Sequence, residues 1–148
     1  MAVVVQIIRR VVGEQGLTPA VIERLQPYVT RYAQTMGIAV FAVGGQEDHL
    51  HILFRLPEDK TLKMIDTELA KTTTRFVRES LALPGFAWAE EPLFLSVSAD
   101  EVEECAAYIL DNPARHASRT AIAAWETDEE ADGDDDAVPE WLRTMVRP

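Results

Sequence analysis

Two histidines separated by one residue, His49 and His51, are the first side chains whose types and spacing could do chemistry. They lie in the stretch Val40 to Leu56, which reads as strand, turn and strand because Gly44-Gly45 and the polar residues 46–48 interrupt two apolar runs. Alternate side chains of a strand point to opposite faces, so both imidazoles project from one face. Such a pair can hold one divalent ion between neutral ring nitrogens. The alternative is a half-buried strand that turns two polar side chains toward solvent.

A tyrosine and an asparagine one helical turn apart, Tyr108 and Asn112, form the second candidate group. Helical spacing predicts that they lie on a different face of their helix from the apolar stripe of Val102, Ala106 and Ile109. A tyrosine hydroxyl is a poor nucleophile at neutral pH because its pKa is near 10. A divalent cation changes this by polarising a phosphate and stabilising the departing oxygen. Two histidines and the amide oxygen of Asn112 would give mixed nitrogen and oxygen ligands, which suit Mg²⁺ or Mn²⁺. Attack of such a tyrosine on a DNA phosphate would give a covalent phosphotyrosine and a free 3′-hydroxyl.

The elements before the histidine pair are predicted from residue type and spacing. Val3 to Val12 is rich in β-branched residues and reads as a strand. Thr18 and the proline after it are typical of a helix start, and the helix should end at Gly37. Pro27 lies inside this helix, so the sequence predicts a kink or a break there.

The elements after the histidine pair complete an alternating pattern. A second helix is expected from Thr61 to about Leu81, and a strand within Phe86 to Val97, irregular at first because of Pro92. Residues 98–101 have the sequence pattern of a capping box, which should begin the helix that carries the tyrosine. The order β-α-β-β-α-β plus a terminal helix predicts an α+β protein with a ferredoxin-like antiparallel sheet, helices packed on one face and a C-terminal helix carrying Tyr108.

Composition limits the function classes. The chain has 148 residues, a net charge of −11 and a single cysteine, Cys105, which excludes an internal disulfide and a cysteine-rich zinc site. The strong negative charge argues against a protein that coats nucleic acid through bulk electrostatics. The apolar start is too short to span a bilayer and lacks the order of a signal peptide, so we expect a cytoplasmic protein with no membrane partner.

The negative charge is concentrated at the carboxyl end. Residues 126–148 hold nine acidic residues and two arginines, which leaves 16 acidic against 12 basic residues elsewhere. We expect two regions, a domain over 1–124 and an acidic tail over 125–148 with a short amphipathic tip. The tail either solubilises the protein or competes with DNA for a basic surface. That surface would be the basic ridge, defined as Lys63, Lys71, Arg75 and Arg78 of the second helix, whose alternative is a solvated helix face.

Several blocks in order resemble the HUH-type single-tyrosine transposases of the insertion-sequence-200 kind and their REP-associated relatives. The segment AVGGQEDHLHILFRLP resembles the family's histidine-hydrophobic-histidine strand with its glycine turn. Phe86–Trp88 and Ser96–Ser98 resemble the segment before the catalytic helix, and VEECAAYILDNP resembles that helix. The resemblance runs from roughly Leu25 to Ala117.

The resemblance implies roles for four residues: His49, His51 and Asn112 as ligands of Mg²⁺ or Mn²⁺, and Tyr108 as the nucleophile. Asn112 stands where insertion-sequence-200 types usually carry a glutamine. The sequence Tyr-Ile-x-x-Asn-Pro, which begins at Tyr108, is closer to the REP-associated branch. The implied activity is cleavage and rejoining of single-stranded DNA with hairpin ends by a homodimer. The acidic body keeps open an alternative, a degenerate or domesticated member that binds nucleic acid or a protein without catalysis.

Overall fold

The computed structural model describes residues 3–13 and 15–112, so the predicted tail over 125–148 and the boundary before it lie outside the described part. Its elements are β1 (Val3–Val12), α1 (Pro19–Thr35), β2 (Val40–Gln46), β3 (His49–Leu56), α2 (Leu62–Arg75), β4 (Ala87–Trp88), β5 (Leu93–Val97) and α3 (Val102–Leu110). A π-helical turn follows α2, and a 3₁₀ turn precedes α3. No helix within the described residues is long and apolar enough to cross a bilayer.

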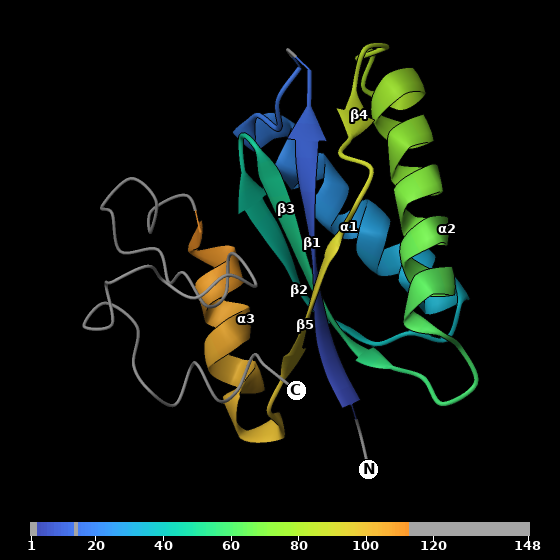
Figure 1. The fold of residues 1–148 in the computed structure, drawn as a ribbon. Coiled ribbons are helices and arrows are strands. Elements are labelled where there is room, and N and C mark those ends of the chain that lie inside the picture. The colour runs from blue at the N-terminus through green and yellow to red at the C-terminus, as the bar shows by residue number, and fades with distance from the viewer. Residues whose placement is uncertain (1–2, 14, 113–148) are drawn as a thin grey trace.

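The sheet is antiparallel and is built around β1. β3 pairs with β1 over its whole length, from Val3 opposite Leu56 to Arg10 opposite His49. β5 pairs with the first half of the other edge of β1, β4 pairs with its end, and β2 pairs with the outer edge of β3. The element order and pairing confirm the predicted α+β fold with a ferredoxin-like sheet (Figure 1).

Helices cover both faces of this sheet. α1 and α2 pack on one face over a core that includes Leu50, Ile52 and Phe54. α3 packs on the opposite face over a second core that includes Leu53 and Leu95 (Figure 1). The sheet is therefore the middle layer, and its central strands β1 and β3 are buried on both sides along most of their length.

Helix starts follow the predicted chemistry in one case and depart from it in another. The Thr18 hydroxyl accepts a hydrogen bond from the Val21 N–H at 3.2 Å and caps α1, which continues past Pro27 without being split. The predicted capping box before α3 is not formed. The Ser98 hydroxyl instead donates to Asp100 Oδ1 at 2.8 Å, because the 3₁₀ turn brings that carboxylate within reach.

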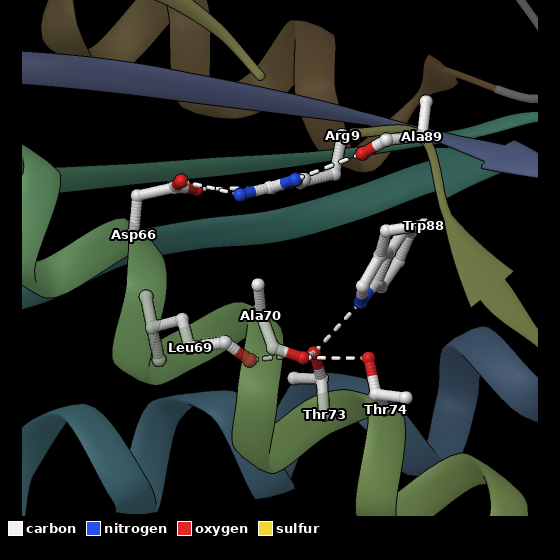
Figure 2. A network of polar contacts seen from close by, with 8 residues as sticks. All are labelled: Arg9, Asp66, Leu69, Ala70, Thr73, Thr74, Trp88 and Ala89. Carbon is white, nitrogen blue, oxygen red and sulfur yellow. Dashed lines mark hydrogen bonds and ion pairs between the residues drawn. The ribbon is translucent and has the colours of Figure 1, made fainter. Parts of the chain in front are cut away.

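A polar network fastens α2 to the sheet (Figure 2). The Arg9 guanidinium of β1 forms two hydrogen bonds with the Asp66 carboxylate of α2 and donates a third to the Ala89 carbonyl at 3.0 Å. The Trp88 indole N–H donates to the Thr73 hydroxyl at 2.9 Å. Because the ion pair is buried, each charge is compensated mainly by the other rather than by water. The pair therefore holds α2 in one position against β1 and β4.

Candidate active site

His49 and His51 lie side by side on β3, on the sheet face that α3 covers, which we call the site face. Their ring centroids are 4.8 Å apart. His49 is 3% exposed and His51 is fully buried. The alternative of two solvent-facing histidines is therefore wrong. A strand buried on both sides has no solvent face for polar residues, so its two imidazoles require polar partners.

Each histidine has a hydrogen-bond partner on its Nδ1 atom. The Nδ1 of His49 lies 2.6 Å from Asp48 Oδ1, and the Nδ1 of His51 contacts Gln6 Oε1 from β1. Neither oxygen carries a hydrogen to donate, so Nδ1 is the donor in each pair. In the neutral form of each ring the lone pair then lies on Nε2, and both Nε2 atoms are buried. This is the neutral tautomer in which histidine binds a metal through Nε2 while a second partner orients the ring.

Tyr108 meets the histidine pair from α3 within the same chain. Its ring centroid lies 6.4 Å from that of His51, with the two planes at 84°, and only 1% of Tyr108 is exposed. The sequence predicted Tyr108 on a different face of the helix from the apolar stripe. That expectation is wrong, because Tyr108 is buried together with Cys105 and Ile109 in the core under α3. Asn112 follows the end of the helix and is fully buried as well.

A glycine lets α3 approach this closely. Gly44 of β2 pairs with His51 of β3. A Cβ atom at position 44 would lie 2.5 Å from the backbone carbonyl oxygen of Ile109, which is closer than such atoms pack. The absence of a side chain at Gly44 therefore sets the distance between α3 and the sheet, and with it the position of Tyr108 over His51.

Three residues that the sequence analysis did not single out belong to this site: Gln6, Arg10 and Asp48. Gln6 is fully buried, and Arg10 stands directly opposite His49 in the β1–β3 pairing, so it shares the site face. A usable signal existed for Gln6, since it is the one polar residue in the apolar run VVVQII. Asp48 directly precedes His49 in the chain, whereas for Arg10 only the strand register reveals the proximity.

Charge at the rim of the site is set by Asp48 and Arg10. Burial acts to raise the pKa of Asp48, but the hydrogen bond and electrostatic interaction with His49, together with the charge of Arg10, hold that pKa below its ordinary value. Asp48 is therefore ionised at neutral pH and is a permanent acceptor for His49. Cys105, deeper under α3, differs: burial raises the pKa of its thiol to about 12, so it stays protonated and packs as an apolar side chain.

Three side-chain atoms that could serve as metal donors are buried. The Oδ1 atom of Asn112 is buried, as are both histidine Nε2 atoms. Within residues 3–13 and 15–112, no three His, Cys, Asp or Glu side chains gather in a metal-binding cluster. An ion on the histidine pair would thus complete its shell with an amide oxygen, water or substrate, a set suited to Mg²⁺ or Mn²⁺.

The basic ridge lies on the other side of the sheet from the site. Lys63, Lys71, Arg75 and Arg78 are all exposed on α2 and the turn after it, and α2 covers the face opposite His51. Lys71 and Arg78 line a groove of about 390 Å³ together with Trp88 of β4. Arg78 is also a structural residue, because its Nε donates to the Phe86 carbonyl at 2.7 Å. The structure thus brings Tyr108 to the histidine pair and places the ridge on the opposite face of the sheet.

A wider cleft of about 720 Å³ opens between the start of α1, the β2–β3 turn and Leu110. Neither histidine nor Tyr108 lines it. This cleft therefore does not coincide with the candidate site. The site is recognised by its buried polar groups and their geometry.

The family model described as "Transposase IS200 like" matches residues 3–112, and the chain belongs to this family. No curated protein matches the chain. Among solved structures it is similar to a protein of Deinococcus radiodurans R1 described as a transposase, with a TM-score of 0.60 and 19% identity over 74% of this chain and 89% of that one.

A second similar structure is a REP-associated tyrosine transposase bound to a REP hairpin. Its TM-score is 0.56, and the identity is 13% over 77% of this chain and 68% of that one. At these identities both likenesses show a shared fold. The family resemblance predicted from the histidine strand and the tyrosine helix is confirmed by the match over residues 3–112.

Proposed function

We propose that this transposase cleaves and rejoins single-stranded DNA through a covalent 5′-phosphotyrosine on Tyr108. The observation that carries the proposal is the meeting of Tyr108 with His51 at 6.4 Å between ring centroids, beside His49 at 4.8 Å from His51. In the reaction the tyrosine oxygen bonds to phosphorus, and the bond from phosphorus to the 3′ oxygen breaks. The phenol gives up its proton, and the 3′ oxygen takes one up. Attack of a 3′-hydroxyl on the phosphotyrosine reverses these changes and rejoins a strand without ATP.

His49, His51 and Asn112 would hold Mg²⁺ or Mn²⁺ at this site. When bound, the ion supplies positive charge that polarises the phosphate and stabilises the leaving oxygen. Asp48 and Gln6 keep the two imidazoles in the Nε2 lone-pair form, and Arg10 adds a positive charge on the same sheet face. Since the ion requires neutral imidazoles, its binding should weaken below about pH 6.5.

Titration of Mn²⁺ tests the metal site. His49→Ala should lower the affinity strongly, because it removes one of the two nitrogen donors. His116→Ala is the matched control, since it removes the third histidine of the chain, which is not a proposed ligand. Equal affinities in the wild type and His49→Ala would remove the metal site from the proposal.

Incubation with single-stranded oligonucleotides from the flanks of its own gene, in the presence of Mn²⁺, tests the chemistry. Denaturing electrophoresis should show a covalent protein–DNA band that Tyr108→Phe abolishes. Tyr32→Phe is the matched control, because Tyr32 contacts Glu68 on the α1–α2 side of the sheet. The similar structure bound to a REP hairpin favours oligonucleotides with hairpin ends as substrates.

A second candidate function is non-catalytic binding of hairpin DNA or of a protein partner. One observation favours it: with 1% of Tyr108 exposed, a phosphate reaches the hydroxyl only if α3 shifts away from the sheet. Tight binding of good substrates without a covalent band would support this second function. A band that depends on Tyr108 would exclude it.

We further propose that the protein works as a homodimer, in which the tyrosine helix of one subunit can serve the histidine pair of the other. α3 follows short turns rather than a strand of the sheet, so it can move without breaking strand pairing. Sedimentation velocity should show a dimer at micromolar concentration. A monomer at every concentration tested would contradict this part of the proposal.

A further inference from the structure

Gln6 occupies a position where a glutamine is costly. β1 is buried on both faces from Val4 to Arg9, and Gln6 is fully buried in the middle of this run. Its neighbours on the site face, Val4 and Ile8, are apolar and belong to the core under α3. An apolar side chain would pack there without any hydrogen-bonding requirement, so the amide needs a reason beyond the fold.

The two ends of the Gln6 amide have different surroundings. The Oε1 atom accepts from the Nδ1 of His51, whereas the Nε2 atom is buried and has no hydrogen-bond partner among the described residues. A glutamine placed only to hold the sheet together would have both ends satisfied. The donor left over points to an oxygen atom that arrives with a ligand, such as a phosphate oxygen or an ion-bound water.

We propose that Gln6 is a positioning residue for His51. Its Oε1 fixes the proton of His51 on Nδ1 and so keeps the Nε2 lone pair directed at a divalent ion, while its own N–H group is available to an oxygen in the same site. This inference rests on the metal site of the proposed function. Gln6 touches the ligand-holding residue rather than the reacting atoms, so its action on the chemistry passes through His51.

The chemistry of the two acceptors explains why they differ. His49 near the rim has the carboxylate of Asp48, which is 65% exposed and therefore solvated. His51 is fully buried, and a carboxylate at position 6 would place an uncompensated charge in the core. A buried negative charge there would also repel a phosphate. A neutral amide fixes the same tautomer without either penalty.

Nuclear magnetic resonance of the histidine side chains in the ion-free protein tests the inference directly. Long-range proton–nitrogen spectra distinguish the two neutral tautomers, and His49→Ala and His116→Ala assign the signals. We expect His51 to be protonated on Nδ1 in the wild type. An Nε2–H tautomer would mean that the Gln6 amide has the reverse orientation, with its nitrogen donating to His51, and would overturn the proposal without any variant.

Two variants extend the test. Gln6→Met keeps the size of the side chain but removes the acceptor, so the Nε2–H tautomer of His51 should become populated and Mn²⁺ affinity should fall about 10- to 100-fold. Gln6→Glu keeps an acceptor at this position, so the Nδ1–H tautomer of His51 should persist, whereas the buried carboxylate should lower the stability of the protein. Gln26→Met is the matched control, because Gln26 donates to the Val43 carbonyl from α1, away from the histidines.

The outcomes separate this inference from the proposed function. If the wild type binds Mn²⁺ and Gln6→Met leaves both the tautomer and the affinity unchanged, the role of Gln6 is wrong and the metal site stands. If the wild type does not bind Mn²⁺, the metal site is wrong, and the spectra of the ion-free protein still decide whether Gln6 sets the tautomer.

Discussion

Replacing Gly44 with alanine should move α3 with a single methyl group. The added Cβ would lie 2.5 Å from the carbonyl oxygen of Ile109 and 3.2 Å from its carbonyl carbon. Because the obstacle is helix backbone, no side-chain rotation can relieve the contact. The two segments must separate, and Tyr108 is the neighbour of Ile109.

The size of the displacement follows from these distances. Real Cβ contacts essentially never fall below 3.0 Å and are ordinary from 3.4 Å, so α3 has to retreat by about 0.5–0.9 Å from β2. Overpacking of this kind costs about 1–3 kcal/mol of stability. A misplacement of about 1 Å can lower a rate about 100-fold, so we expect covalent complex formation by Gly44→Ala to fall about 10- to 100-fold.

Single-turnover formation of the Tyr108–DNA complex measures this effect. Nuclear Overhauser contacts between the rings of Tyr108 and His51 provide a readout that needs no activity, and they should weaken in Gly44→Ala. Gly85→Ala is the matched control, because its Cβ would meet only the flexible end of the Gln15 side chain, at 3.1 Å. A Gly44→Ala protein with wild-type contacts and a wild-type rate would refute the reasoning.

Three further predictions concern stability and DNA binding. Asp66→Ala leaves the Arg9 guanidinium buried without its partner and should lower the free energy of unfolding in urea by about 3–5 kcal/mol. The double variant Arg9→Met/Asp66→Leu should recover most of this loss. A loss below about 1 kcal/mol in Asp66→Ala would contradict the prediction. Burial raises the pKa of Cys105 to about 12, against an ordinary 9.0, so the thiol ionises in the unfolded chain before it ionises in the folded protein. The neutral thiol therefore contributes its full stabilisation below about pH 9. Above that pH the free energy of unfolding falls by about 1.4 kcal/mol per pH unit until about pH 12. Unfolding at pH 8 and pH 10 should therefore show a smaller decline in Cys105→Ala than in the wild type. Lys71→Ala should reduce the slope of log affinity for single-stranded DNA against log salt concentration by about 0.7. Lys60→Ala, which lies outside the basic ridge, should reduce this slope less. Equal slopes in the wild type and both variants would exclude a phosphate contact at Lys71.

Local chemistry made much of the fold predictable. The strand Val3–Val12 has the bounds that its β-branched run indicated, and Thr18 caps α1 through its own hydroxyl. These features depend on neighbours within a few residues, which the chain order displays directly. The same holds for the histidine strand, whose alternation places both imidazoles on one face whatever the rest of the chain does.

Ser98 marks where local reasoning failed. The sequence pattern of a capping box is present, but in the tighter 3₁₀ turn the Ser98 hydroxyl donates to Asp100 instead. Tyr108 was assigned to the wrong face of its helix for a related reason. Helical spacing defines faces only relative to one another, and which face turns inward depends on the surface that the helix meets.

The composition of the site was decided by tertiary structure. Gln6 and His51 are 45 residues apart, and they meet because the β1–β3 register places Ile8 opposite His51 and Gln6 two residues away on the same face. Gly44 could be read from the chain as part of a turn, yet in the structure it is the point where α3 approaches the sheet. The sequence by itself determined which residues could do chemistry and which strand carries them. Only the packing of α3 and the pairing of β1 decided which side chains share the site, because register and helix docking are set by contacts between distant segments.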